Sequence, residues 1–209
     1  MISVVIPTYN RPELLTERAI PSVYRQTISD WELIVVGDGT DDETVARMLA
    51  YTPDERVRFV NLAHAIYPEN VRAAWGISGA VAANHGWDIA RGKWFWRLDD
   101  DDELLPHAFE TLLEAQARTG ADFVYGISEW WGKGGSMHTL QGSFPPRAGK
   151  IADGANLRLT SLPHRYRTTG SAKAADSQMW EQMVADGGLF HFEPVVIHRY
   201  WHWRPGFGG

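Results

Sequence analysis

The sequence predicts an α/β fold with a mostly parallel central sheet flanked by helices. Short runs of β-branched and apolar residues, typical of buried strands, occupy residues 2–6, 31–36 and 57–62. Helical segments separate these runs at a βαβ spacing, and this alternation is typical of parallel sheets. The 209 residues are enough for one large domain and no clear linker divides them, so we expect a single domain over 1–209.

The first two helices are predicted from their N-terminal residues. Asn10 can cap a helix that has Pro12 in its first turn. This helix should continue to Val23 with a kink at Pro21, because proline lacks the N–H group that the helix needs there. A second helix should begin at Asp42, since an acidic side chain is favourable in the positively polarised first turn of a helix.

The next elements continue the alternation of helices and strands. A helix rich in small residues is expected over 79–90, and a strand over 93–98. An amphipathic helix should cover 106–119 and end at Gly120, and a strand should follow over 122–127. These elements extend the predicted sheet by two strands.

The pattern changes in the last third of the chain. Residues 132–150 are rich in glycine and proline and have no clear period, which favours loops or a short hairpin that could cover a site. A helix is expected over 171–186 and a last strand over 195–197. The tail, 204–209, is expected to be flexible.

The bulk composition argues against several classes of protein. The net charge is −6, so neither nucleic acid nor an anionic membrane is indicated as a partner. There is no cysteine, which excludes disulfides and thiolate metal sites. The sequence contains neither an apolar run long enough to span a bilayer nor the features of a signal peptide. We expect a cytoplasmic protein, with peripheral membrane attachment as an alternative; the oligomeric state is not indicated.

Five consecutive acidic residues, 99–103, follow the predicted strand over 93–98. Like charges disfavour one another, so such a run must either face solvent or surround a cation. Asp99 and Asp101 should point to the same side if the chain stays extended. Their all-oxygen donor set suits Mg²⁺ or Mn²⁺. The alternative is a solvated helix start, which we favour for Glu103.

Three separate segments should meet at this acidic run. Ligands of open α/β sheets bind beyond the carboxyl ends of the strands. Thr8, Asp38 and the acids from Asp99 onward all follow predicted strands. Their convergence on one crevice predicts a ligand site without reference to any family. For Asp38, an equally good interpretation is that it only caps the next helix or shapes a turn.

Three blocks of sequence, residues 3–11, 32–40 and 90–102, together resemble family 2 glycosyltransferases with the GT-A fold. They match the family's opening strand, its second strand with an acidic loop, and its Asp-x-Asp metal motif. The resemblance implies transfer of a sugar from a nucleotide-diphosphate sugar to a hydroxyl of a saccharide or other acceptor. A UDP-sugar is favoured and a GDP-sugar is the alternative. Residues 1–125 would bind the donor and 126–209 the acceptor.

The resemblance also implies roles for individual residues. Asp101, Asp99 and a C-terminal histidine, His202 or alternatively His198, would form the site for Mn²⁺ or Mg²⁺, with Asp99 binding the water shell of the ion or the donor's ribose. Asp176 would be the general base, which implies inversion at the anomeric carbon; the alternative is a plain N-terminal helix acid. The remaining donor-binding candidates are Pro7, Thr8, Tyr9, Arg11, Asp38, Asp100 and Arg199. Arg199 is expected, with Arg204, to clamp the diphosphate. Trp130 and Trp131 are expected on the acceptor side.

The sequence departs from the family pattern at three positions. Gly37 replaces the first of two acids after the second strand, and Ala175 replaces an acid before Asp176. Ala83 stands where an arginine usually precedes an asparagine, so a phosphate or base contact is expected to have moved, with Arg72 and Arg91 as candidates. These departures keep open a second class, a nucleotide- or metal-binding module without turnover. A nucleotidyltransferase is disfavoured, because the loop after the first strand is not glycine-rich.

Overall fold

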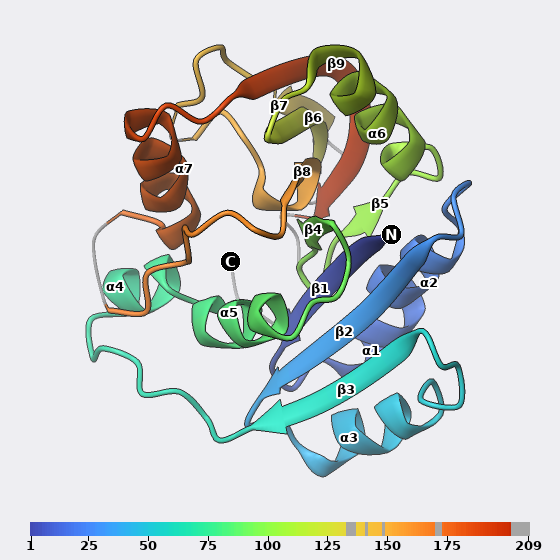
Figure 1. The fold of residues 1–209 in the computed structure, drawn as a ribbon. Coiled ribbons are helices and arrows are strands. Elements are labelled where there is room, and N and C mark those ends of the chain that lie inside the picture. The colour runs from blue at the N-terminus through green and yellow to red at the C-terminus, as the bar shows by residue number, and fades with distance from the viewer. Residues whose placement is uncertain (133–136, 141, 148, 170–172, 202–209) are drawn as a thin grey trace.

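The computed structural model describes residues 1–132, 137–140, 142–147, 149–169 and 173–201. A nine-stranded sheet runs through the described part of the chain with helices on both faces (Figure 1). Its order is β3 (Val57–Leu62), β2 (Trp31–Asp38), β1 (Ile2–Thr8), β4 (Trp94–Arg97), β8 (Asn156–Leu159), β6 (Phe123–Trp131), β9 (Phe190–Trp201) and β5 (Glu103–Leu104), with β7 (Met137–Leu140) paired to β6.

The sheet is mostly parallel, as the sequence predicts. Strands β1 to β4 pair in parallel, and β6 and β9 run in the same direction. Strand β8 is antiparallel to both of its neighbours, β4 and β6, and so joins the two parallel groups. Strands β5 and β7 are antiparallel additions to β9 and β6. The expected α/β fold is therefore confirmed.

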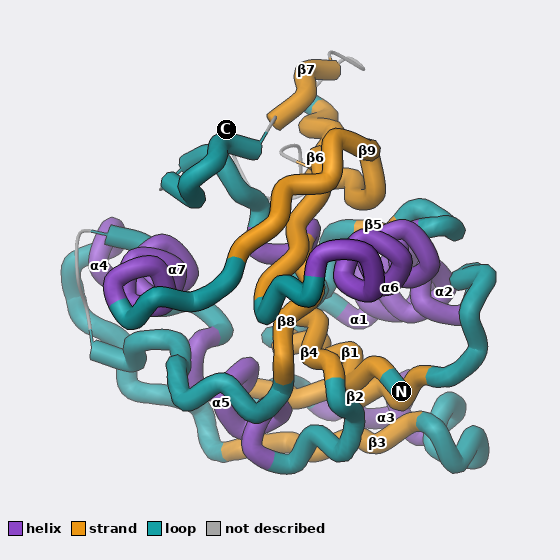
Figure 2. The backbone as a smooth tube through the Cα atoms, turned by 45° about the horizontal axis from the view of Figure 1, so that its top comes forward, coloured by secondary structure: helices purple, strands orange, loops and turns teal. Residues whose placement is uncertain are grey.

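Alternation along β1 divides the core into two clusters. Val4 and Ile6 face one cluster with Leu15, whereas Val5 faces the other with Trp87. The first cluster contains residues of α2 (Ile20–Tyr24), α3 (Asp42–Leu49) and α6 (Ala108–Thr119), and the second contains residues of α5 (Ala80–Asp88) and α7 (Ala175–Ala185). Gly86 of α5 permits this packing, because a Cβ atom there would lie 2.4 Å from Val5 Cγ1. Figure 2 shows α5 and α6 on opposite sides of the strands.

The helices have the following bounds in the described ranges: α1 (Pro12–Leu14), the π-helical turn η1 (Leu15–Ala19), α2 (Ile20–Tyr24), α3 (Asp42–Leu49), α4 (Val71–Gly76), α5 (Ala80–Asp88), α6 (Ala108–Thr119), the 3₁₀ turn η3 (Asp153–Ala155) and α7 (Ala175–Ala185). The segment from Pro12 to Tyr24 is helical throughout, and η1 lies directly before the turn that contains Pro21. A wider π turn is one way in which a helix accommodates the missing N–H of proline. None of the helices in these ranges is both long and apolar enough to cross a membrane.

Several elements differ from the sequence-based expectation. Helix α4 and strand β8 were not predicted. Glu103 does not start a helix, because it lies in β5 and pairs with Arg199 of β9. The interpretation of Glu103 as a helix acid is therefore wrong. Within the segment 132–150, expected to form loops or a short hairpin, the described residues include one strand, β7, which pairs with the preceding β6. The tail 204–209 lies outside the described residues.

Candidate functional site

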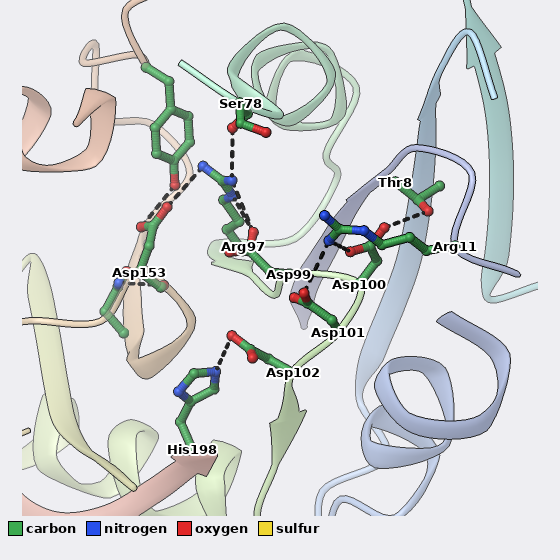
Figure 3. A network of polar contacts seen from close by, with 12 residues as sticks. Thr8, Arg11, Ser78, Arg97, Asp99, Asp100, Asp101, Asp102, Asp153 and His198 are labelled. Carbon is green, nitrogen blue, oxygen red and sulfur yellow. Dashed lines mark hydrogen bonds and ion pairs between the residues drawn. The ribbon is translucent and has the colours of Figure 1, made fainter. Parts of the chain in front are cut away.

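The carboxyl ends of β1, β2 and β4 lie at one edge of the sheet, and the predicted polar residues follow them. The loop after β4 carries four successive aspartates, Asp99 to Asp102, which we call the acid loop. It is anchored at its start by Leu98, whose N–H donates to the Val5 carbonyl at 3.0 Å. Figure 3 shows that Asp99 points toward Arg97 and Asp102 toward His198, whereas Asp100 and Asp101 share Arg11.

Asp100 and Asp101 face the segment that follows β1. Thr8 Oγ1 donates to Asp100 Oδ2 at 2.8 Å. Arg11 Nη1 donates to Asp100 Oδ1 at 2.9 Å and to Asp101 Oδ2 at 3.0 Å. From the π-helical turn, Arg18 Nη1 donates to the Asp101 carbonyl at 2.7 Å. One helical segment therefore supplies two arginines that hold the acid loop.

Asp99 faces a buried arginine of β4. Arg97 Nη2 donates to Asp99 Oδ1 at 2.9 Å and to the Ser78 carbonyl at 3.3 Å. Its Nη1 atom lies 3.1 Å from Asp153 Oδ2. Arg97 also lies over the ring of Tyr166, 4.9 Å from its centroid. Sequence reasoning missed Arg97, although a charged residue inside an apolar strand was a signal that it has a buried partner.

Asp102 faces strand β9. His198 Nε2 lies 3.3 Å from Asp102 Oδ2, and the N–H of Trp201 donates to Asp102 Oδ1 at 3.1 Å. The Nδ1 atom of His198 lies 2.8 Å from Ser128 Oγ. Burial raises the pKa of Asp102, and His198 opposes this shift. Burial likewise raises the pKa of Asp100, while the Arg11 guanidinium acts in the opposite direction.

Asp38 shapes the segment that follows β3 and does not cap a helix. Its Oδ1 accepts the N–H of Ala65 at 2.7 Å, and its Oδ2 accepts the hydroxyl of Tyr67. The cap of α3 is Asp41, so the capping interpretation of Asp38 is wrong. Tyr9 stacks on a neighbouring histidine ring and is 47% exposed. Pro7 and Thr8, at the end of β1, are buried beside it.

The structure explains the absence of an acid at Gly37. Gly37 pairs with Asn61 of β3, and a Cβ atom at Gly37 would lie 2.5 Å from Asn61 Oδ1. Asn61 accepts the N–H of Thr40 at 3.0 Å and donates to the Thr40 carbonyl at 3.1 Å. The asparagine side chain therefore fills the space next to Gly37 and fixes the loop after β2.

Asp176 lies in the first turn of α7, and the charge of Asp99 in the acid loop affects its pKa. Its Oδ1 accepts the N–H of Ser177 at 2.5 Å. Burial and the negative charges of Asp153 and Asp99 raise the pKa of Asp176 to about 7, against the Ser177 bond and the charge of Arg97. Ala175, which stands where the family pattern has an acid, is buried in the second core cluster.

The other arginines that were predicted to contact the donor do not contact the acid loop in the described residues. Arg199 pairs with Glu103 at 3.0 Å and with Glu129 at 2.9 Å. Arg91 precedes β4 and its N–H donates to Glu32 near the start of β2, so it lies at the opposite edge of the sheet and cannot take over a donor contact. Arg72 is exposed on α4.

Two of the predicted groups, His202 and Arg204, lie outside the described residues. The aromatic pair expected on the acceptor side is described. Trp130 contacts Tyr200, with ring centroids 4.7 Å apart, and Trp131 stacks on Trp201 at 5.7 Å. In both pairs, one residue comes from the end of β6 and the other from the paired end of β9.

Sequence reasoning also missed a buried network around η3. Asp153 pairs with Arg97 and lies 3.3 Å from Arg158 Nη1. The Tyr166 hydroxyl donates to Asp153 at 3.1 Å and lies against Arg158. Asp153, Arg158 and Tyr166 come from a part of the sequence for which no element is predicted, so only the tertiary structure brings them to Arg97.

The acid loop has donor chemistry that fits a hard divalent cation. It offers carboxylate oxygens from successive residues, and Mg²⁺ usually takes one or two carboxylates and completes its shell with phosphates and water. Within the described ranges, no group of three or more acidic or histidine side chains stands ready to hold an ion alone. An ion bound here would therefore need oxygens from a phosphate ligand or from water.

The fold and the site define an α/β domain of the nucleotide-binding type, with carboxylates gathered at the carboxyl ends of its strands. The sequence profile described as glycosyl transferase family 2 matches residues 3–164. This match spans well over half of the chain, and the chain therefore belongs to glycosyl transferase family 2, as its three sequence blocks predict.

Curated relatives agree with this membership. The chain is 35% identical over 127 residues to the GalNAc(5)-diNAcBac-PP-undecaprenol beta-1,3-glucosyltransferase of Campylobacter jejuni, covering 60% of this chain and 37% of that protein. It is 31% identical over 208 residues to the uncharacterized glycosyltransferase YwdF of Bacillus subtilis, covering 97% of this chain and 65% of that one. The chain spans only 33% to 38% of the length of four curated relatives.

Solved structures share the fold. A crystal structure of Staphylococcus aureus TarS, residues 1–349, superposes with a TM-score of 0.73 at 16% identity, covering 96% of this chain and 60% of that one. The mannosyltransferase PcManGT from Pyrobaculum calidifontis, in complex with GDP-Man and Mn²⁺, gives 0.69 at 14% identity, covering 98% and 58%. At these identities the likeness shows the fold alone, and it confirms the expected GT-A architecture.

Proposed function

We propose that the chain is the catalytic domain of a metal-dependent, inverting glycosyltransferase that uses a nucleotide-diphosphate sugar. The observation that carries this proposal is the charge environment of Asp176. Its carboxyl group lies close enough to Arg97, Asp99 and Asp153 for their charges to shift its pKa. A candidate base from the last third of the chain therefore lies within electrostatic range of Asp99 in the acid loop.

The donor nucleoside would lie beside Asp38 and Tyr9. The Asp38 side chain is nearly buried, and its hydrogen bonds to Ala65 and Tyr67 would fix it as an acceptor for a base imide or a ribose hydroxyl. The half-exposed ring of Tyr9 would line the nucleoside with Pro7 and Thr8. A UDP-sugar is the favoured donor, since TarS has been crystallised with UDP-GlcNAc. A GDP-sugar is the alternative, as in the PcManGT complex.

Asp101 and Asp99 would hold Mn²⁺ or Mg²⁺, with His202 as the candidate third ligand and Asp100 beside them on the donor. When bound, the ion would neutralise the charge that develops on the leaving nucleoside diphosphate. Arg11 lies against the same carboxylates and would reach the phosphates from there. Arg199 would contribute only by exchanging its present carboxylate partners for the diphosphate.

Asp176 would remove the proton from the acceptor hydroxyl as that oxygen attacks the anomeric carbon. A base with a pKa near the working pH is suited to this task. Attack from the face opposite the leaving group, in a single displacement, inverts the anomeric configuration. Trp130 and Trp131 would offer flat surfaces to the acceptor sugar.

The acceptor is proposed to be a saccharide, and a lipid-linked saccharide fits the relatives. Two of them are named for acceptors carried on diphosphoundecaprenol. Such an acceptor would bring the enzyme to the cytoplasmic face of a membrane as a peripheral protein. This assignment concerns the activity of a whole protein, and the chain spans only part of the length of these two relatives.

Two measurements test the proposal: the thermal stabilisation of the protein by nucleotides, and the hydrolysis of nucleotide-sugar donors. UDP, GDP, CDP and dTDP are compared with and without Mn²⁺, because a ligand that binds only the folded state stabilises it according to its affinity. We expect the largest shift with UDP and Mn²⁺, and an Asp176→Asn variant that keeps this shift but loses hydrolysis by at least about a hundredfold. No metal-dependent shift with any nucleotide would contradict the proposal.

A binding module without turnover is the second candidate, and Gly37 and Ala175 are the observations that favour it. Both positions lack an acid that the family pattern has, and both are filled by packing, with Asn61 beside Gly37 and the second core cluster around Ala175. If the wild-type protein binds UDP with Mn²⁺ but never hydrolyses any donor, the module is the better assignment.

A further inference from the structure

We propose that Arg11 is the resident counter-ion of the acid loop. In the absence of a divalent ion its guanidinium holds Asp100 and Asp101 in place, and it leaves Asp101 when an ion binds. The second half of this inference rests on the proposed function, because it requires that the acid loop take up a divalent ion. Arg11 is thereby a positioning residue of the loop.

The burial of the acid loop creates the need for a counter-ion. Asp100, Asp101 and Asp102 are only 4%, 0% and 2% exposed. A buried carboxylate without a partner is costly, and neighbouring carboxylates disfavour each other's ionised form. The chain therefore has to bring positive charge or hydrogen-bond donors to each of them.

The cations around the loop differ in how firmly they are held. Arg97 is almost fully buried and is fixed by Asp99, Asp153 and the Ser78 carbonyl. The Arg11 side chain is 25% exposed, and its Nη1 atom reaches both Asp100 Oδ1 and Asp101 Oδ2 (Figure 3). Of the two arginines that contact the loop carboxylates, Arg11 is therefore the one that can turn toward solvent or toward a ligand.

Asp100 and Asp101 would respond differently to the departure of Arg11. Asp100 keeps the hydrogen bond from Thr8 Oγ1 at 2.8 Å, so it remains anchored to β1. Asp101 is the residue proposed as metal ligand, and a divalent ion would supply more positive charge than the guanidinium does. The ion and Arg11 are thus alternative sources of positive charge for the same carboxylate group, which Arg11 contacts through Oδ2.

This exchange couples ion binding to nucleotide binding. An ion that arrives alone must displace the guanidinium without offering it a new partner. A diphosphate offers oxygens both to the ion and to the freed guanidinium, which forms strong charge-assisted hydrogen bonds with phosphate. We therefore expect Mn²⁺ alone to bind the wild-type protein weakly and Mn²⁺ with UDP to bind it much more strongly.

Thermal unfolding of three proteins in EDTA, in Mn²⁺ and in Mn²⁺ with UDP tests the inference. In EDTA, Arg11→Met should unfold roughly 5 to 10 °C below the wild type, because a buried charge loses its partner. Mn²⁺ alone should restore most of this difference, and it should shift the wild type by less than about 2 °C. The control is Arg25→Met, which removes an exposed arginine 3.5 Å from Glu103 and should follow the wild type.

A second variant distinguishes the loss of charge pairing from a general loss of stability in Arg11→Met. Arg11→Met combined with Asp100→Asn deletes one positive and one negative group, so in EDTA it should recover at least half of the lost unfolding temperature. The inference is overturned if this double variant stays as unstable as Arg11→Met, or if Mn²⁺ alone stabilises the wild type as much as Arg11→Met. The EDTA arm involves no ligand, so it still reports on Arg11 if the wild type shows no nucleotide-dependent shift and the proposed function fails.

Discussion

Asp176 illustrates at the scale of one residue how burial turns an ordinary carboxyl group into a candidate base. Its position at the start of α7 and the N–H of Ser177 both favour the ionised form. Burial and the nearby charge of Asp153 outweigh them, and the pKa rises to about 7. The chain thus keeps near its acid loop a group that is partly protonated at neutral pH, at a cost in stability.

That cost can be measured. An unfolded aspartate ionises near 3.8, and the native pKa of Asp176 is about 7. Between these values the native state binds more protons than the unfolded state, so stability falls as the pH rises through this window and stays low above it. Without metal, Asp176→Asn should raise the free energy of unfolding at pH 8 by about 1 to 2 kcal/mol, a figure reduced for solvent screening. At pH 3.5 urea unfolding should show no difference.

Asp186 at the other end of α7 provides a control of opposite sign. Its hydrogen bonds from His164 and Gln182 lower its pKa. A lowered pKa stabilises the native state above the unfolded pKa, and this contribution disappears as the pH falls. Asp186→Asn should therefore be slightly destabilising at pH 8. If Asp176→Asn were destabilising at pH 8, as Asp186→Asn should be, the account of Asp176 would be wrong.

At the scale of elements, the pairing of β2 with β3 determines what Gly37 can be. Restoring the family acid as Gly37→Asp would drive a Cβ atom to 2.5 Å from Asn61 Oδ1 and 2.8 Å from Thr40 Cγ2. We expect a loss of about 1 to 3 kcal/mol, typical of overpacking. In the background of Asn61→Ala the same change should cost less than half as much. Urea denaturation of the four proteins gives the coupling, and equal costs in both backgrounds would show that Asn61 is not the obstacle.

The elements also show which parts of the fold are predictable from sequence. Strands β1 to β3 are short and rich in apolar and β-branched residues, so their sequence composition is enough to predict them. Strand β8 has only four residues and includes the fully buried Arg158. An arginine does not indicate a buried strand in the sequence, because its buried partners Asp153 and Tyr166 are known only from the structure. The two residues of β5 are a strand only because β9 lies beside them.

The same distinction holds for the candidate site. The acid loop and Asp38 stand out in the sequence because each follows a predicted strand, whereas Asp176 is indicated by the family resemblance. Arg97 and Asp153 could not be paired from sequence, since they are far apart in the chain and no spacing links them. The cationic partners that neutralise the acid loop are therefore a property of the tertiary structure.

At the scale of the whole molecule, the turn η3 contacts both β4 and β9. Through these strands it contacts residues that bind the first and the last aspartate of the acid loop. Asp153 pairs with Arg97 on the side of Asp99. The Gly154 carbonyl accepts the indole N–H of Trp96 at 2.8 Å, in β4. Gly154 also packs against His198 of β9, the partner of Asp102. A single turn therefore positions groups on either side of the candidate site.

This arrangement predicts that Gly154→Ala disturbs the site through His198. An alanine Cβ would lie 2.3 Å from His198 Nε2, and both residues are buried, so the imidazole must move away from Asp102. Loss of about 1 to 3 kcal/mol of unfolding free energy is expected from overpacking. In a His198→Ala background the added methyl group has room, and the same change should cost less than about 0.5 kcal/mol. Chemical denaturation of the four proteins measures the coupling, and a cost that is the same in both backgrounds would mean that η3 does not act on the acid loop through His198.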